Sequence, residues 1–316
     1  MSSQWMRRGW LALVCASLLL LAACGSGSIE SQLEPSRIVV FGDALSDLGQ
    51  TGPRYTVNDG SSNIWTKQLA DRFGVPLSAA SAGGTSYATG NARVNTHPDA
   101  AGNNATPTVK EQIDTFLASN AIAENDLLVV QGGTSDIIVE VGKFLAGTQT
   151  RDQMLANVRQ AGRDLAAQAR RLVNAGAKHV VVAGPYHLGK SPWAIGIAQV
   201  DLLTEASQRF NDDLLVTMVD LGANVLYVDG AQHFNLMVAF PPSYELTNVI
   251  DSVCISVDPG PGMGIGSGQV NSALCTTATL AAANYQNFLF ADRVYPTPQG
   301  HRKFGDYAYD RIRARW

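Results

Sequence analysis

Charged side chains are scarce in this chain. Asp, Glu, Lys and Arg make up 16% of the 316 residues, and 23 basic against 27 acidic side chains give a formal net charge of −4. Proteins that bind nucleic acid usually carry a basic surplus, so this balance argues against that class of partner. The low charged fraction is more typical of a secreted bacterial protein than of a highly charged cytosolic one.

Cysteine is also rare, with four in the whole chain. Their spacing fits no metal site, and we expect neither a metal nor a cofactor. Cys15 and Cys24 belong to the N-terminal segment, which leaves Cys254 and Cys275. In an oxidising compartment two such cysteines usually pair, and a bond across the glycine-rich stretch 258–268 would stabilise the fold by roughly 3 kcal/mol. The alternative is two separately buried thiols.

Long apolar runs are limited to one short segment near the N-terminus. Positions 10–21 are mostly apolar, follow Arg7 and Arg8, and end in the sequence Leu-Ala-Ala-Cys at Cys24. The run is too short for a membrane span and has the length of a signal peptide. Its end resembles the bacterial lipobox, in which the cysteine is lipidated and becomes the first residue. The alternative is an ordinary cleavage site beside a chance cysteine.

This N-terminal pattern predicts three parts. They are a lipoprotein signal peptide at 1–23, the lipidated Cys24 with a flexible tether at 24–36, and one domain at 37–316. A lipid anchor places the protein in the bacterial cell envelope. Because Gly25 follows the cysteine where an aspartate would favour the inner membrane, the outer membrane is expected.

Beyond the tether, strand-like and helix-like patterns alternate. The strand candidates are short runs rich in Val, Ile and Leu, which suits a parallel sheet covered on both faces. The helix candidates repeat apolar residues every three or four positions. This order predicts an α/β fold, a three-layer α/β/α sandwich around a mainly parallel sheet. The predicted strands are 37–41, 126–131, 179–184 and 224–228, and the main predicted helices are 64–73, 108–117, 152–175, 199–221 and 298–313.

Four sequence blocks in this domain carry residues typical of a catalytic site. They are Phe-Gly-Asp-Ala-Leu-Ser-Asp at 41–47, Ser-Tyr-Ala-Thr-Gly-Asn-Ala at 86–92, Gly-Gly-Thr-Ser-Asp at 132–136 and Phe-Ala-Asp-Arg-Val-Tyr-Pro-Thr at 290–297. Their order and spacing resemble those of the GDSL (SGNH) lipases and esterases, from about Arg37 to Arg313. The resemblance implies the SGNH-hydrolase fold and carboxylic-ester hydrolysis.

Three of the five catalytic positions that the resemblance implies hold a different residue here. The nucleophilic serine is replaced by Ala44, the asparagine of the oxyanion hole by Ser135, and the basic histidine by Tyr295. Gly90 keeps the position of the oxyanion-hole glycine, and Asp292 keeps that of the carboxylate that orients the base. A methyl group cannot act as a nucleophile, and tyrosine, with a pKa of ~10, is a poor base at neutral pH.

These substitutions predict an esterase-like lipoprotein with lost or greatly weakened hydrolysis and a retained binding cleft. A lipid, an acyl ester or an acylated glycan is the expected ligand. The first alternative is an active carboxylic-ester hydrolase with a rearranged site, although a structural role is expected for Ser46, His187 and His301. The second is an engineered chain, but one deliberate substitution would explain Ala44 and not Ser135 or Tyr295.

Overall fold

The computed structural model describes residues 33–61 and 63–316. The predicted signal peptide and Cys24 lie outside these residues. Leu33 is buried in the hydrophobic core, and the Ser36 amide donates a hydrogen bond to the Asn125 carbonyl. The compact part of the chain therefore begins before Arg37, which corrects the end of the predicted flexible tether.

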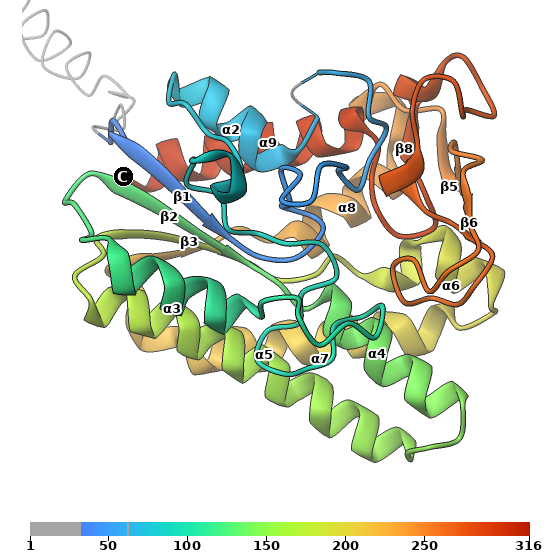
Figure 1. Ribbon diagram of the computed structural model, residues 1–316, viewed down its shortest axis with the longest axis horizontal. Coiled ribbons are helices and arrows are strands. Elements are labelled where there is room, and N and C mark those ends of the chain that lie inside the picture. Colours follow the sequence, from blue (N-terminus) through green and yellow to red (C-terminus); the bar gives the residue numbers. More distant parts are fainter. Residues whose placement is uncertain (1–32, 62) are drawn as a thin grey trace, which may run out of the picture. The chain divides into compact units, whose positions relative to one another are not determined.

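A four-stranded parallel sheet forms the centre of the fold, in the order β1-β2-β3-β4 (Figure 1). A fifth segment extends it beside β1, because the Val40 amide bonds to the Thr85 carbonyl and the Tyr87 amide bonds to the Val40 carbonyl. The strands are β1 (Arg37–Phe41), β2 (Asp126–Gln131), β3 (His179–Ala183) and β4 (Val225–Tyr227). The predicted strands 179–184 and 224–228 are thus slightly too long.

Helices cover both faces of this sheet, which confirms the predicted three-layer α/β/α fold. One layer consists of α3 (Val109–Ser119), α5 (Arg151–Asn174) and α7 (Val200–Thr217), and the other of α2 (Trp65–Phe73), α8 (Gly230–Ala239) and α9 (Pro298–Arg315). The predicted helix 199–221 is two elements, since α7 ends at Thr217 and a 3₁₀ turn spans Val219–Leu221. Two further helices are α4 (Thr134–Leu145) and the short α6 (Pro192–Gly196).

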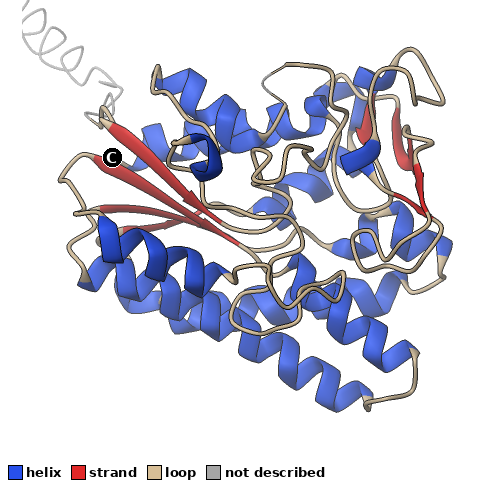
Figure 2. Ribbon diagram, in the orientation of Figure 1, coloured by secondary structure: helices blue, strands red, loops and turns tan. Residues whose placement is uncertain are grey.

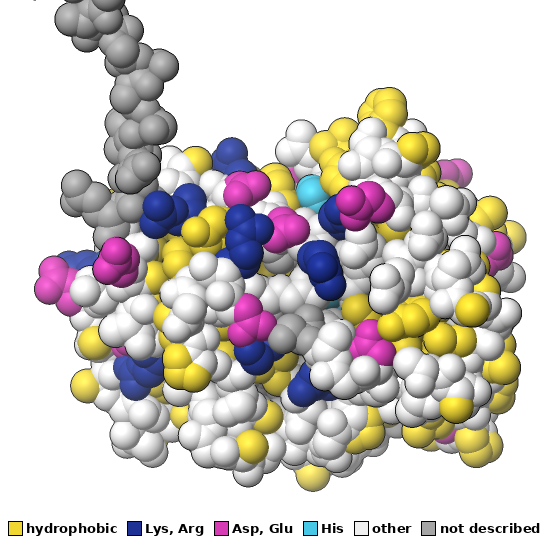
Figure 3. Space-filling view, turned by 90° about the horizontal axis from the view of Figure 1, so that it is seen from above, with side chains coloured by type: hydrophobic (Ala, Val, Ile, Leu, Met, Phe, Trp, Pro, Cys, Tyr) yellow, Lys and Arg dark blue, Asp and Glu magenta, His cyan; other side chains and the backbone are white. Residues whose placement is uncertain are grey.

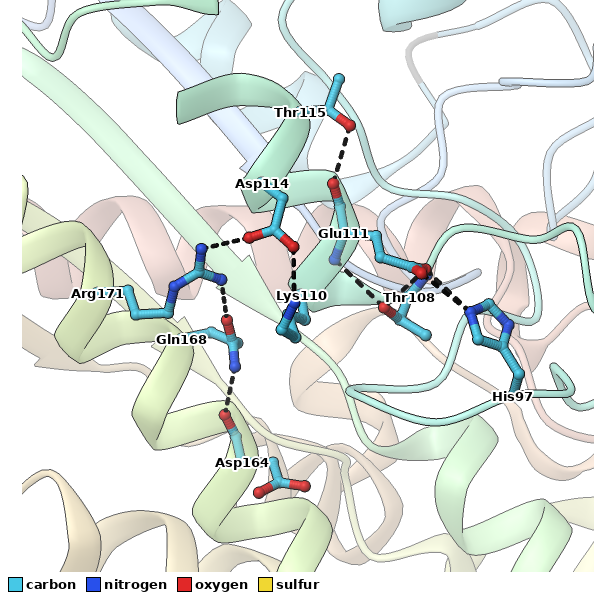
Figure 4. Close-up of polar contacts among 9 residues, drawn as sticks. All are labelled: His97, Thr108, Lys110, Glu111, Asp114, Thr115, Asp164, Gln168 and Arg171. Carbon is cyan, nitrogen blue, oxygen red and sulfur yellow. Dashed lines mark hydrogen bonds and ion pairs between the residues drawn. The ribbon is translucent and has the colours of Figure 1, made fainter. Parts of the chain in front are cut away.

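Ion pairs join neighbouring helices within each layer. Asp114 of α3 pairs with Arg171 of α5 and with Lys110 of its own helix (Figure 4). Gln168 of α5 accepts a hydrogen bond from Arg171. In the other layer, Arg72 of α2 pairs with Asp306 of α9. The face in Figure 3 accordingly shows basic and acidic side chains side by side. Within the part of the chain that the structure covers, none of the helices has both the length and the apolar character needed to cross a membrane.

Two small sheets form a separate module after α8 (Figure 2). The strands are β5 (Asn248–Ser252), paired with β8 (Phe288–Phe290), and β6 (Val257–Asp258), paired with β7 (Gln269–Val270). A disulfide joins Cys254 to Cys275 inside this module, as predicted. The bond closes a loop over a sequence separation of 21 residues, which includes the glycine-rich stretch 258–268.

Candidate active site

The carboxyl end of β1 enters a tightly bonded turn at Gly42, Asp43 and Ala44. Both backbone polar groups of Gly42 bond to the Gln112 amide, at 2.8 and 2.9 Å. Asp43 accepts hydrogen bonds from the amides of Leu45 (3.0 Å) and Thr134 (3.2 Å), so it joins the β1 turn to the start of α4. Burial raises the pKa of Asp43 to about 6. The turn therefore places the Ala44 methyl group at the nucleophile position, with no exposed surface.

Ser46 and His301 have structural partners around Trp65. The Ser46 hydroxyl donates to Gln131 Oε1 and accepts from Trp65 Nε1, both at 3.0 Å. His301 Nδ1 accepts from the Trp65 amide at 3.3 Å, and burial lowers the pKa of His301 to about 3. A hydroxyl engaged in this way and an imidazole that binds protons so weakly do not form a nucleophile and base pair.

Two buried hydroxyl groups at the predicted site find no hydrogen-bond partner among the residues that the structure describes. They are Ser135 Oγ, in the first turn of α4, and Tyr295 Oη, which follows β8. The Tyr295 ring packs edge to face on Tyr55, with centroids 5.3 Å apart. Burial raises the pKa of Tyr295 well above its ordinary value, and the negative charge of Asp43 acts in the same direction. Tyr295 is thus an even poorer base than an exposed tyrosine.

Asp292 is fully occupied by backbone and serine donors. One oxygen accepts from the amides of Val294 and Tyr295, both at 2.7 Å. The other accepts from the Ser272 amide at 3.0 Å and from the Ser272 hydroxyl. A carboxylate has about four acceptor positions, so these four bonds fill it. Burial nevertheless raises the pKa of Asp292 to about 6. In this structure Asp292 holds two loops together rather than orienting a base.

The position predicted for the oxyanion-hole glycine is already engaged. The Gly90 amide donates to Asp47 Oδ2 at 2.8 Å, and Asp47 also accepts from the amides of Gly49 and Gln50. The Tyr55 ring lies against Gly90, since a Cβ built there would come within 2.3 Å of Tyr55 Cε2. The oxyanion role predicted for Gly90 is therefore not available in this arrangement, because its N–H cannot also meet a developing negative charge.

The glycine-rich loop packs beside the predicted site. Asn91 Nδ2 donates to the Gly262 carbonyl at 3.0 Å, and Met263 in the same loop is buried in the main core. Gly264 has φ +88°, and a Cβ there would lie 2.1 Å from the Ala100 carbonyl oxygen. A side chain would therefore be both strained and obstructed at this position.

The retained cleft that the sequence predicted is closed. The side chains of Asp43, Ala44, Ser135, Asp292 and Tyr295 are all buried, with at most 1% exposure. Because these side chains have almost no exposed surface, a ligand could reach them only if surrounding residues moved. Tyr55 packs on Tyr295, and the loop 258–268 contacts Asn91. Asp47, Tyr55 and Met263 take part in this packing, and no sequence pattern marks them for that role.

The other predicted positions have different surroundings. His187 lies beyond the end of β3 and contacts Asn235 of α8. Asp136 of the third block pairs with Arg93 at 3.1 Å and accepts from the Val94 amide, inside a buried ion cluster with Glu140. Within residues 33–61 and 63–316, no group of three or more His, Cys, Asp or Glu side chains is placed to hold a metal ion.

Two buried tyrosines allow a test of the unpaired hydroxyl. Tyr295→Phe should leave the free energy of unfolding unchanged or raise it by up to about 1 kcal/mol, because it removes a buried hydroxyl with no partner. Tyr186→Phe is the matched control, since its hydroxyl donates to the Val294 carbonyl at 2.6 Å, and should cost about 1–3 kcal/mol. Urea unfolding measures both. Equal losses in the two variants would show that Tyr295 Oη has a partner.

The fold and these blocks define a protein of the esterase-like α/β class. The chain belongs to the GDSL-like lipase/acylhydrolase family, whose model matches residues 38–308. Among curated proteins it is 27% identical over 330 residues to an uncharacterized protein in the trpE-trpG intergenic region of Pseudomonas putida, covering 95% of this chain and 52% of that protein. It is also 27% identical over 210 residues to a phosphatidylcholine-sterol acyltransferase of Aeromonas hydrophila, covering 63% and 58%.

Similar solved structures include two esterases. Est24, a carbohydrate acetylesterase from Sinorhizobium meliloti, is 14% identical with a TM-score of 0.46, over 87% of this chain and 97% of that one. The aryl esterase of M. smegmatis is 16% identical with a TM-score of 0.41, over 89% and 100%. The chain spans about half the length of the first two curated relatives.

Proposed function

We propose that this protein keeps the GDSL esterase fold but has lost or greatly weakened ester hydrolysis. The observation that carries this proposal is Ala44, a buried methyl group at the turn after β1 where the family has its nucleophile. Nucleophilic catalysis needs a hydroxyl, thiol or similar group at that atom. The members of a catalytic triad act as a unit, and loss of the nucleophile alone removes on the order of 10⁶ in rate.

The remaining positions support the same conclusion. Tyr295 has a raised pKa, Asp292 is saturated by other donors, and the Gly90 amide is bonded to Asp47. The alternative, an active hydrolase with a rearranged site, needs a nucleophile with a base beside it. Ser46 and His301 do not supply that pair, because both are bonded to Trp65.

A lipid, an acyl ester or an acylated glycan remains our proposed ligand class, by analogy with the family. Entry of such a ligand requires covering residues to move, and we propose the glycine-rich loop, which is bonded to Asn91, as the segment that moves. Four glycines of that loop, Gly262, Gly264, Gly266 and Gly268, have positive φ values. Residues without a Cβ adopt such conformations at little cost, which would ease a rearrangement of the loop.

Covalent labelling tests the loss of the nucleophile. A fluorophosphonate reacts with an activated serine, whose oxygen displaces fluoride from phosphorus. We expect no label on the chain carrying Cys24→Ala, which removes the predicted lipidation site and leaves every described residue unchanged. A labelled peptide that contains Ser46 or Ser135 would support the rearranged hydrolase instead. A related active esterase in the same reaction serves as the positive control.

We further propose that Cys24 anchors the protein in the bacterial envelope, in the outer membrane. The support is the sequence Leu-Ala-Ala-Cys after an apolar run with a basic start. Chain expressed with its own signal should enter the detergent phase on phase separation, since buried acyl chains hold a protein at a membrane. Cys24→Ser should release it or leave it unprocessed. Intact mass showing unlipidated wild-type chain with another first residue would contradict the anchor.

A further inference from the structure

Two adjoining hollows lie at the β4 edge of the main sheet, whereas Ala44 follows β1. We call the first the polar cavity; it has a volume of about 470 Å³ and contains His187, Asn211, Asp212, Tyr227, Asp229 and Asn235 in its lining. We call the second the apolar groove; it has about 400 Å³ and is lined by Leu215, Val216, Met218, Val219, Gly222, Val225 and Tyr227. Leu215 and Tyr227 line both, so the two hollows adjoin at these side chains.

The position of the polar cavity follows from the fold. His187 lies beyond the carboxyl end of β3, and Asp229 follows β4. In open α/β sheets, ligands bind outside the carboxyl ends of the strands. β4 is the edge strand farthest from β1 in the sheet, so this cavity is separate from the closed site after β1.

Polar groups in the cavity retain unused bonding capacity. Asn235 Nδ2 lies 2.9 Å from His187 Nδ1, so the amide donates and the His187 proton resides on Nε2. Asp229 uses one oxygen to cap α8, through the Gln232 amide at 2.8 Å.

The charge of the cavity favours a cation. Asp212 and Asp229 are its charged lining residues, and neither forms an ion pair with any residue that the structure describes. Lys190, a basic side chain outside the lining, acts on His187 in the direction opposite to Asp212 and Asp229. Tyr227 adds an aromatic ring at the junction with the apolar groove. Carboxylates and an aromatic face together suit an ammonium group.

Several aliphatic side chains that line the apolar groove are exposed. Val216 and Val219 are 75% and 79% exposed, and Leu215 is 40% exposed. Each methylene group buried against such a surface improves affinity by about fourfold. A ligand that fills both hollows therefore needs a cationic head joined to an aliphatic chain.

We propose that this surface binds a single-chain amphiphile whose head carries an ammonium group. The head occupies the polar cavity beside Asp212 and Asp229, and the chain lies in the apolar groove over Leu215 and Val219. This inference does not depend on the lost hydrolysis, because it involves none of the residues after β1.

Calorimetric titration with three probes of equal chain length tests the head group. Decylammonium, decyl sulfate and decyl maltoside are compared below their micelle concentrations, on the chain carrying Cys24→Ala. We expect decylammonium to bind at least tenfold more tightly than decyl sulfate, with the maltoside between them. Butylammonium should bind far more weakly than decylammonium. Equal affinity for the three decyl probes would overturn the proposal.

Matched variants locate the binding site. Asp212→Asn with Asp229→Asn keeps the α8 cap and should remove most of the preference for the cation, whereas Asp310→Asn, a charge change on the far side of α9, should not. Val219→Ser should weaken every decyl probe several-fold, and Ile250→Ser, at an equally aliphatic exposed position, should not. If the Asp212→Asn, Asp229→Asn variant still prefers the cationic probe as the unaltered chain does, the proposed position of the head group is wrong. A dimer that Val219→Ser dissociates and that excludes the probe would show a second copy in the groove, and the proposal would be wrong.

Discussion

Ala44→Ser combined with Tyr295→His should give measurable hydrolysis of p-nitrophenyl acetate, at least tenfold above either single variant. The serine supplies an attacking oxygen, and the histidine supplies an imidazole, which accepts a proton at neutral pH far better than a tyrosine hydroxyl does. Ala44→Ser alone should stay near background, because burial raises the pKa of Tyr295 and makes it a still weaker base. Initial rates, corrected for hydrolysis in a blank without enzyme, measure the difference.

The saturation of Asp292 limits this recovery and can be relieved. A new histidine at 295 must compete for Asp292 with the Ser272 hydroxyl and amide. Adding Ser272→Ala to the double variant frees one acceptor position and should raise the rate further. Ser256→Ala is the matched control, since its hydroxyl donates to the Asn271 carbonyl in the same module. Adding Ser135→Asn should restore an oxyanion donor. In other enzymes, removal of one such donor lowers the catalytic rate by about 10²–10³.

Full activity in the Ala44→Ser variant alone would contradict this account. It would mean that Ala44 is an isolated substitution in an otherwise working site. Tyr295 or another buried group would then have to accept the serine proton despite its surroundings.

Reduction of the disulfide should cause the largest loss of stability. Closing the loop between Cys254 and Cys275 limits the unfolded chain and contributes about 3 kcal/mol in the chain-entropy model. The bond also secures Ser272, which clamps Asp292 in the folded state. The melting temperature should therefore fall by about 5–10 °C in reductant.

The Cys254→Ala, Cys275→Ala double variant is the control for this measurement. It should melt at the temperature of the reduced wild-type chain and should not respond to reductant. Identical melting of the oxidised and reduced wild-type chains would show that the loop adds little stability. Mapping that found both thiols free in envelope material would contradict the bond itself.

Much of the fold could be predicted because its signals are local. β1 and β2 are continuous apolar runs, and their predicted bounds match the structure. The helix α4 was missed because it begins after Gly133, at φ +111°, with no side-chain cap to mark its start. α8 did carry a signal, the capping Asp229, within a stretch that was not assigned. The strands β6 and β7 have two residues each, too few for any periodic pattern.

The candidate site was predictable in its positions but not in its closure. Ala44 follows β1, Ser135 follows β2, and Tyr295 follows β8 of a smaller sheet; the structure buries all three. Closure depends on contacts between distant segments, such as Asn91 with Gly262, 171 residues apart, and Gly90 with Asp47. No local pattern encodes such contacts, so the sequence predicted an open cleft where the structure has a covered one.

Ester turnover by the otherwise unaltered chain tests the central claim most directly. The full chain carrying only Cys24→Ala is assayed with p-nitrophenyl acetate and butyrate, against a mock purification. We expect no hydrolysis above that background, because Ala44 offers no attacking oxygen and the site is closed. A turnover rate of about 1 s⁻¹ or more, within the usual range of enzymes, would contradict it.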